Sequence, residues 1–254
     1  MASGADRPPP TQSPIRLVVV LGAALATALL YFFGTGLHPI PWLTWLAPLP
    51  VLLLAPRASA RIAALAAFTG YFLGGSNIWR YYTIDLQLPP TLTLLAVVGL
   101  PLLLTAITLL FRGVLRRGRP LVAATVFPAG IAAAEYLVSI ATPAGANWSL
   151  APTQADLLPV LQLASLTGGW GVSFLVSAVP TVLAVLATPT VSTVGRWRTG
   201  LAGLVVVGLA LGYGAGREHT LDHAAAAPRI TLLSARTTHD QVWVDSPAGR
   251  NLLS

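Results

Sequence analysis

The sequence predicts an all-α polytopic membrane protein, a bundle of about seven transmembrane helices followed by a short external α/β segment. Three observations predict this class. Of 254 residues, 55% are hydrophobic and only 9% are charged, and the mean hydropathy is +0.73. Soluble domains carry roughly 25% charged residues, so a water-exposed surface of ordinary polarity is excluded. The apolar residues gather in long runs, and the arginines fall between those runs with a bias to one side.

Composition also excludes several function classes. The net charge of +7 is spread between apolar runs and not gathered on one face, so no nucleic-acid partner is expected. All the basic residues are Arg, with no Lys, and the chain has no Cys. Disulfides, thiolate metal sites and a cysteine nucleophile are therefore excluded within these residues.

The elements follow a polar, Pro-rich segment at 1–16, which is predicted to be a disordered cytoplasmic leader. The first apolar run is interpreted as a signal anchor, because it is longer than the ~7–15 residues of a signal-peptide core and no cleavage site follows it. The apolar runs are Leu17–Phe33, Trp42–Ala55, Ile62–Trp79, Thr91–Phe111, Leu121–Ala141, Leu157–Ala187 and Thr199–Gly214.

Two of these runs have the wrong length for one span of about 20 residues. Leu157–Ala187 is too long, and the sequence Thr167-Gly168-Gly169 predicts a division into an interfacial piece and a span over Trp170–Ala187. Trp42–Ala55 is short and contains two prolines, so it is either a crossing or a re-entrant segment.

Arginine placement favours seven crossings with a cytoplasmic N-terminus, because cytoplasmic loops are enriched in Lys and Arg. With Trp42–Ala55 crossing, Arg80 alone lies in an outer loop between helices. A re-entrant Trp42–Ala55 would place the segment Arg112–Arg119 outside. With Trp42–Ala55 crossing, the inside segments hold Arg7, Arg16, Arg57, Arg61, Arg112, Arg116, Arg117, Arg119, Arg196 and Arg198.

This topology divides the chain into the leader, a transmembrane helical domain at 17–216 and an external tail at 217–254. The tail is predicted to be a linker and the start of a truncated soluble domain, since the short β-like run Ile230–Leu233 cannot bury a core by itself. Within the tail, His219 and His223 are spaced i, i+4, but nothing supplies a third ligand, so neither a metal site nor a cofactor is expected.

Candidate substrate-binding residues are Glu135, Asn147, Trp148 and Gln154. Glu135 is the one acidic residue within a predicted span, where an ionisable group is costly unless it is paired or functional. It is either part of a functional site or a carboxyl hydrogen-bonded to Trp, Tyr or Ser in the bundle. Trp148 is either part of a head-group pocket or an interfacial belt residue. No residue is assigned a catalytic role.

Several segments, taken in order, resemble the membrane domain of bacterial apolipoprotein N-acyltransferase. Phe127-Pro128 with Glu135 is similar to that family's Pro-x-x-Trp-x-x-x-Glu segment, and Gly145-Ala146-Asn147-Trp148 with Gln154 stands in place of its Gly-x-Pro-Trp and later Ser-Gln. Three further segments carry the resemblance: His38–Pro50 with its Ala-Pro-Leu-Pro, Gln162–Leu175 with its Gly-Gly-Trp-Gly, and Pro228–Leu233, where a nitrilase-like domain would begin.

The resemblance implies a reaction in which an acyl chain moves from a phospholipid to the α-amino group of a lipoprotein's lipidated N-terminal cysteine. Family members use a Glu–Lys–Cys triad with a thioester intermediate. This chain has neither Lys nor Cys. It is therefore expected to be the membrane half, inactive alone, in the bacterial inner (cytoplasmic) membrane. Membrane phospholipids, lipidated proteins and a separate catalytic domain are the partners implied.

Two other functions stay open on the sequence. One is a small-molecule transporter or channel, which usually places several polar groups at mid-membrane. The other is a non-catalytic membrane scaffold that binds lipoproteins. Whether the chain acts as an enzyme is therefore left undecided by the sequence.

Overall fold

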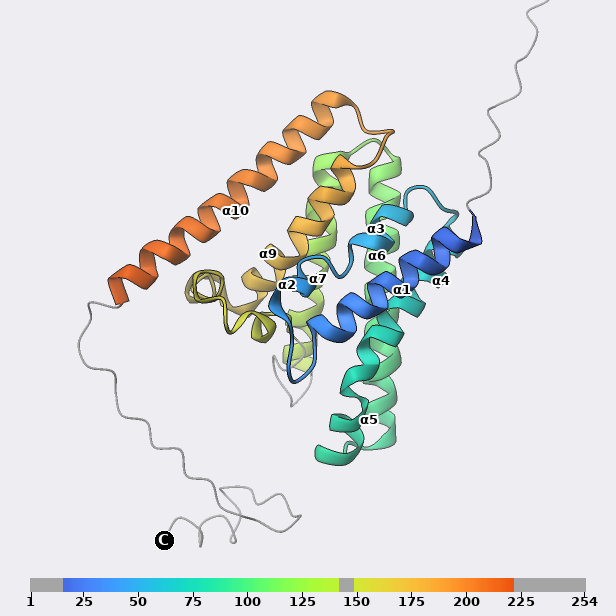
Figure 1. Cartoon of the computed structure of the whole chain (residues 1–254), viewed down its shortest axis with the longest axis vertical. Helices are drawn as coiled ribbons and strands as arrows, with labels where there is room; N and C mark the ends of the chain where they lie inside the picture. Colours follow the sequence, from blue (N-terminus) through green and yellow to red (C-terminus); the bar gives the residue numbers. More distant parts are fainter. Residues whose placement is uncertain (1–15, 142–148, 222–254) are drawn as a thin grey trace, which may run out of the picture. The chain divides into compact units, whose positions relative to one another are not determined.

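The computed structural model describes residues 16–141 and 149–221, and every regular element within these ranges is a helix (Figure 1). This confirms the all-α class. Residues 1–15 of the predicted leader at 1–16 and the predicted α/β segment after 221 lie outside the described residues. The predicted domain boundary at 217 falls inside the last helix, which continues to Leu221.

Five helical stretches of the described chain are long and apolar enough to cross a membrane. This supports a multi-pass membrane protein. The five are α1 (Leu17–Gly34), the stretch Pro90–Arg116, α7 (Pro120–Ala141), α9 (Ala164–Leu186) and α10 (Thr193–Leu221).

The stretch Pro90–Arg116 contains α5 (Pro90–Leu94), the π turn η3 (Leu95–Gly99) and α6 (Leu100–Arg116). Pro101 has no N–H to donate to the carbonyl four residues earlier, so the regular α pattern is interrupted just before α6. A π turn is one way in which a helix absorbs such an interruption.

The two remaining predicted spans are shorter or less regular than expected. The run at 42–55 forms α2 (Pro41–Thr44) and α3 (Leu49–Leu54), separated at Pro48. The run at 62–79 forms α4 (Ala60–Gly74), which continues into the 3-10 turn η1 (Gly75–Ile78) and the π turn η2 (Tyr81–Asp85). Successive glycines end the regular part of α4.

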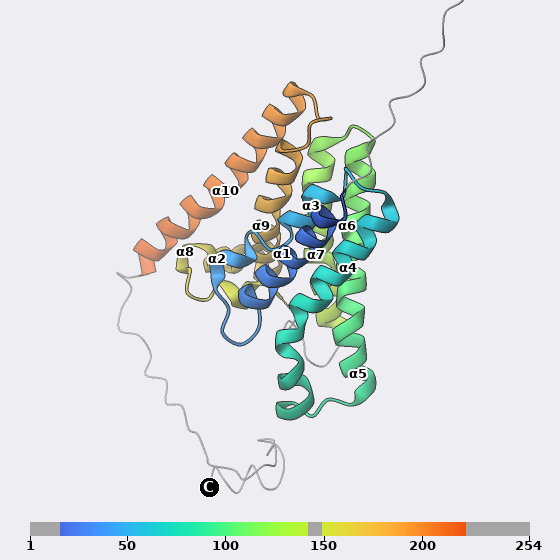
Figure 2. The ribbon, with the colours of Figure 1, turned by 45° about the vertical axis from the view of Figure 1, so that its right-hand side comes forward.

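Helices α1 and α4 pack closely and run in the same direction (Figure 2). Gly70 lies against Thr27 and Ala24, and one turn later Gly74 lies against Tyr31 and Ala28. Because two parallel helices begin at the same end of the bundle, the segment between them must return along its length. The contacts therefore support a crossing by α2 and α3 and disfavour a re-entrant loop.

Three loops meet at the end of the bundle where α4, α7 and α10 begin. The Arg57 guanidinium donates to the carbonyl of Ala187 at 2.8 Å, joining the α3–α4 loop to the end of α9. Arg112 donates to the carbonyl of Ala58 at 2.9 Å. Pro120 lies against Gly195, so the α6–α7 and α9–α10 loops are adjacent. We call this end the arginine end.

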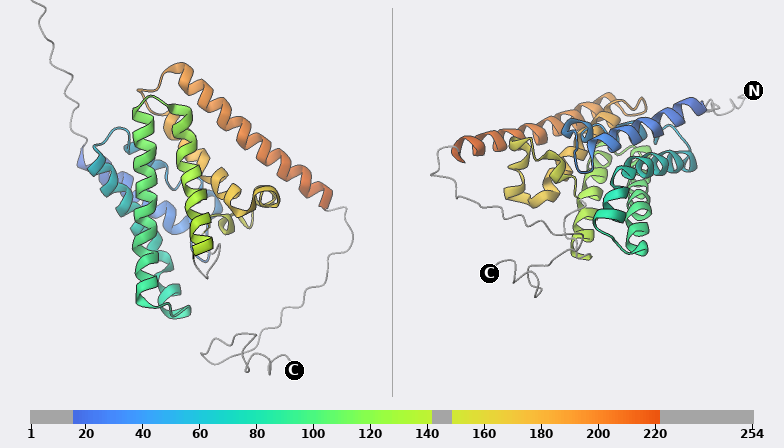
Figure 3. Two further views of the ribbon diagram at one scale, coloured as in Figure 1. Left: turned by 180° about the vertical axis from the view of Figure 1, so that it is seen from behind. Right: turned by 60° about the horizontal axis from the view of Figure 1, so that its bottom comes forward.

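The main core lies between α4, α6, α7 and α9, with α6 and α7 side by side (Figure 3). Phe111 of α6 and Phe127 of α7 are fully buried there. The Tyr71 hydroxyl lies 3.1 Å from that of Thr108, which adds a buried polar contact between α4 and α6.

The predicted division of the run at 157–187 is confirmed. A short helix α8 (Leu158–Leu161) precedes α9, and Gly168 in α9 has φ 67°, a backbone conformation that favours glycine. Helix α10 packs back on this region at Gly214, which lies directly against the Pro159 carbonyl. Arg217 of α10 also donates to the side-chain oxygen of Gln162 at 3.1 Å.

Candidate functional site

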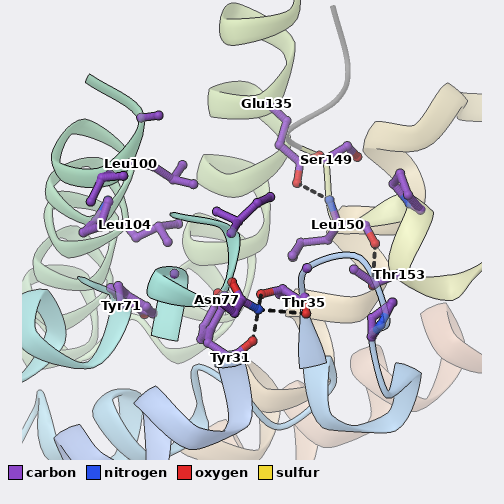
Figure 4. Close-up of a pocket in the computed structure, with 18 of the residues that line it drawn as sticks. Tyr31, Thr35, Tyr71, Asn77, Leu100, Leu104, Glu135, Ser149, Leu150 and Thr153 are labelled. Atoms are coloured by element: carbon purple, nitrogen blue, oxygen red, sulfur yellow. Dashed lines mark hydrogen bonds between the residues drawn. The ribbon is translucent and has the colours of Figure 1, made fainter. Parts of the chain in front are cut away.

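A cavity of about 380 Å³ lies away from the arginine end, between α1, the η1–η2 turns, α6 and α7. Glu135 and the loop at 149–153 form one side of it, and Tyr31 and Asn77 form the facing side (Figure 4). Its walls are mostly apolar. The apolar and aromatic lining includes Tyr31, Leu37, Tyr71, Ile78, Tyr81, Tyr82, Val97, Leu100, Leu104, Ile131 and Ala134.

Glu135 supplies the carboxylate of this cavity and is only 9% exposed. One carboxylate oxygen accepts from the backbone N–H of Leu150 at 2.9 Å, and the other accepts from the Ser149 hydroxyl at 2.9 Å. The Ser149 hydroxyl is in turn 3.1 Å from that of Ser173 on α9. These hydrogen bonds do not use all the lone pairs of the carboxylate, so Glu135 is able to bind a donor in the cavity.

Asn77 holds the opposite wall of the cavity to the end of α1. Its side-chain N–H group donates to the carbonyls of Phe32 and Thr35 at 2.7 and 2.9 Å, and these carbonyls belong to the end of α1. The neighbouring η2 turn contributes Tyr82, and burial raises the pKa of its phenol to about 12. The phenol is therefore neutral at physiological pH, and the wall carries polar groups without charge.

Gln154 lies outside the cavity lining and is fully buried. Its side-chain oxygen accepts from the Trp45 indole N–H at 2.8 Å. Its amide nitrogen donates to the hydroxyls of Thr44 and Thr153, both at 2.8 Å, and to the Pro41 carbonyl at 3.3 Å. These bonds hold the loop that carries Ser149 and Leu150 against α2.

The structure thus places two of the four predicted substrate-binding residues. Glu135 is hydrogen-bonded to a serine, as one of the two interpretations expected, and it also lines the cavity. Gln154 supports the loop beside it. Asn147 and Trp148 lie outside the described residues, directly before Ser149. Their binding roles, like those of Glu135 and Gln154, stay predictions.

Sequence reasoning missed Ser149, Ser173 and Asn77. Single serines and asparagines in and beside apolar helices are common, and no pattern marked these three. One usable signal for Asn77 was its position just after Gly74-Gly75. Glycines favour the end of a helix, and an asparagine side chain often hydrogen-bonds backbone groups in the turn that follows. Within 16–141 and 149–221, no group of His, Asp or Glu residues is placed to hold a metal ion.

The fold and the cavity define a class, that of helical membrane domains with a partly apolar cavity and a buried carboxylate. The family model for the apolipoprotein N-acyltransferase N-terminal domain matches residues 11–182, which is more than half of the chain. The chain belongs to this family. No curated protein and no solved structure gave a significant match.

Proposed function

We propose that this chain is the membrane half of a phospholipid-to-lipoprotein N-acyltransferase and that its cavity receives the lipid substrate. The observation that carries the proposal is the composition of the cavity, in which an apolar wall leads to one buried carboxylate. Membership in the N-acyltransferase family supports the same assignment. The inner membrane of a bacterium, with a cytoplasmic N-terminus, is the proposed location.

In this proposal the acyl chain of the phospholipid enters the cavity and packs against the apolar side chains of Leu100, Leu104 and Ile131. The polar end of the substrate lies at Glu135. When ionised, the carboxylate favours a donor with positive charge, such as an amine. Both an amine-bearing lipid head group and the α-amino group of a lipoprotein have this chemistry.

The transfer step requires residues that these 254 positions do not contain. In the family's mechanism a thiolate attacks the acyl ester, and a carboxylate and a lysine move protons and stabilise the oxyanion. The chain has no Cys and no Lys. We therefore propose that the Cys and Lys come from a further segment or a partner chain on the outer side of the membrane.

A photoreactive phospholipid tests lipid occupancy of the cavity. The purified chain is reconstituted in vesicles with a diazirine-bearing acyl chain, irradiated and digested, and the labelled peptides are mapped. Leu104→Trp is the test variant, because Leu104 lines the cavity and a larger side chain there fills it. Leu102→Trp is the control, because Leu102 belongs to the same helix but is 54% exposed. We expect Leu104→Trp to remove label from the Ile131–Glu135 region and Leu102→Trp to leave it. Equal labelling in both variants would contradict the proposal.

A second experiment separates the enzyme from a scaffold. The chain is reconstituted with a nitrilase-like domain that carries Glu, Lys and Cys, together with a labelled phospholipid and a lipidated peptide. Transfer of label to the peptide amine that needs both parts supports the acyltransferase. Crosslinking of the peptide to this chain without transfer would instead identify a lipoprotein-binding scaffold. Glu135-dependent solute flux into empty vesicles would identify a transporter.

A further inference from the structure

The arginine end carries a high density of positive charge that the cavity and the acyl-transfer reaction do not use. Eight arginines lie in or beside its three loops. They come from the α3–α4 loop and the start of α4, from the end of α6 and the α6–α7 loop, and from the start of α10. They are Arg57, Arg61, Arg112, Arg116, Arg117, Arg119, Arg196 and Arg198.

Three of these arginines have structural partners. Arg57 donates to the carbonyls of Leu53 and Ala187, and Arg112 donates to that of Ala58. Arg196 donates to the carbonyls of Thr188 and Pro189 at 3.1 and 3.0 Å. All of these acceptors are backbone carbonyls at or just beyond the ends of α3 and α9. These guanidinium groups are therefore used to join the loops.

The other five arginines are exposed and make no hydrogen bond or ion pair with any residue that the structure describes. They are Arg61, Arg116, Arg117, Arg119 and Arg198. The acidic residues of the described ranges belong to other regions: η2, the middle of α7, the loop after η4 and the last turns of α10. No carboxylate in the described ranges therefore neutralises these five charges.

The surface beside Arg198, at the start of α10, is apolar. Trp197 stands between Arg196 and Arg198 and is 75% exposed, and Val194 and Leu201 on the same helix are each 61% exposed. A soluble anion would satisfy the arginines but leave this apolar surface in contact with water. An amphiphile with a negatively charged head satisfies both. Tryptophan beside arginine is also typical of a membrane interface.

We propose that the five free arginines, with Trp197 beside them, form a binding surface for anionic phospholipid head groups. The phosphate lies against the guanidinium groups of the α6–α7 loop and Arg198, which Pro120 and Gly195 bring together. The acyl chains lie along the exposed apolar face of α10. Basic surfaces of this kind beside membrane-spanning helices select anionic over zwitterionic lipids.

Lipid selectivity is measured by native mass spectrometry of the purified chain from nanodiscs that contain phosphatidylethanolamine with a quarter phosphatidylglycerol or cardiolipin. We expect the wild type to retain the anionic lipids preferentially. Each arginine near an anionic surface contributes about a fivefold preference, so Arg116→Gln/Arg117→Gln/Arg119→Gln is expected to retain roughly a hundredfold less. The same three positions changed to Lys keep the charge, and this variant should retain most of the preference.

Further controls separate this surface from general charge effects and from misfolding. Arg117→Gln and Arg80→Gln each remove one charge, and only Arg117→Gln should lower anionic lipid retention. Thermal unfolding of each variant in one detergent shows that the fold is kept. Equal retention of zwitterionic and anionic lipids by the wild type would overturn the proposal. So would displacement of the lipid by inorganic phosphate at millimolar concentration, because the site would then bind a soluble anion.

Discussion

The Glu135 carboxylate holds the loop at 149–154 in place by two hydrogen bonds, one to a backbone N–H and one to a hydroxyl. Glu135→Ala removes both acceptors and leaves the Leu150 N–H without its partner, which costs about 1–3 kcal/mol. Local opening of the loop should then be roughly ten to a hundred times more frequent. Hydrogen exchange of peptides that cover 149–154 measures this increase directly.

Glu135→Gln serves as the matched control, because its amide oxygen still accepts from Leu150 and its amide nitrogen is able to donate to Ser149. Exchange near the wild-type rate is expected for Glu135→Gln, and also for Glu218→Ala on α10. Unchanged exchange in Glu135→Ala would show that the loop is held by other contacts.

Gln154 makes more hydrogen bonds that hold the same loop than Glu135 does. Gln154→Leu preserves the volume but leaves the Trp45 indole N–H without its acceptor and removes the donor to the Thr44 hydroxyl oxygen, which should lower the free energy of unfolding by about 2–4 kcal/mol. Thermal unfolding in detergent, followed by tryptophan fluorescence, checks this value. Gln162→Leu removes one hydrogen bond at a half-buried position and should cost less. Equal losses in the two variants would contradict the assigned role of Gln154.

Among single residues, the sequence predicted Glu135 as a candidate site residue because an acidic side chain within an apolar run is costly unless it is paired or functional. It did not predict the partners of Glu135 or Gln154. Ser149 is 14 residues from Glu135, and Trp45 is 109 residues from Gln154. Contacts over such separations depend on how the helices pack, which hydrophobic periodicity does not specify.

Among the elements, the α1–α4 pair depends on the absence of a side chain at Gly74. A Cβ there would lie 2.5 Å from the Tyr31 Cβ and 3.1 Å from the Ala28 carbonyl oxygen. Gly74→Ala should therefore lower the free energy of unfolding by about 1–3 kcal/mol through overpacking. Gly75→Ala is the control, since a Cβ at Gly75 would contact nothing within 4 Å. Equal thermal stability of the two variants would show that the helices separate without cost.

The positions of the long helices followed from the apolar runs and their lengths, and the break at Gly168 followed from its glycine pair. The irregular turns did not. The π turn η3 lies just before Pro101, both π turns contribute side chains to the cavity, and a span that contains them has the same composition as a regular helix. Helix α10 extends beyond the predicted run at both ends, because its polar ends, which include Arg196 and Arg217, make contacts only in the folded bundle.

For the whole molecule, the seven-crossing topology stays a prediction that the packing supports. It places Arg119 in the cytoplasm and Asp156 on the outer side. Reporter proteins fused after each residue in separate strains test this, with alkaline phosphatase active outside and a fluorescent protein active inside. A cytoplasmic signal at both sites, or at neither, would contradict the topology.

Charge bias and hydropathy together predicted the class and most spans, because both are properties of the chain and do not depend on tertiary contacts. For the segment at 42–55, length and composition do not decide between a crossing and a re-entrant loop. Fourteen residues from Pro41 to Leu54 reach about 21 Å as a helix, which is short of a 30 Å hydrocarbon core. The arginine bias favours a crossing, and the direction in which α1 and α4 pack adds independent support for it.

The parallel packing of α1 and α4 has a consequence for how the protein is made. The chain emerges from the ribosome in order, so α1 enters the membrane before the proline-broken segment and well before α4. That segment alone is a poor membrane helix, and in the folded bundle α3 packs against α1, α4 and α9. We therefore expect this segment to reach its final position only after the later helices α4 and α9 have been inserted, and a variant that disrupts α4 to misplace residues that were synthesised before it.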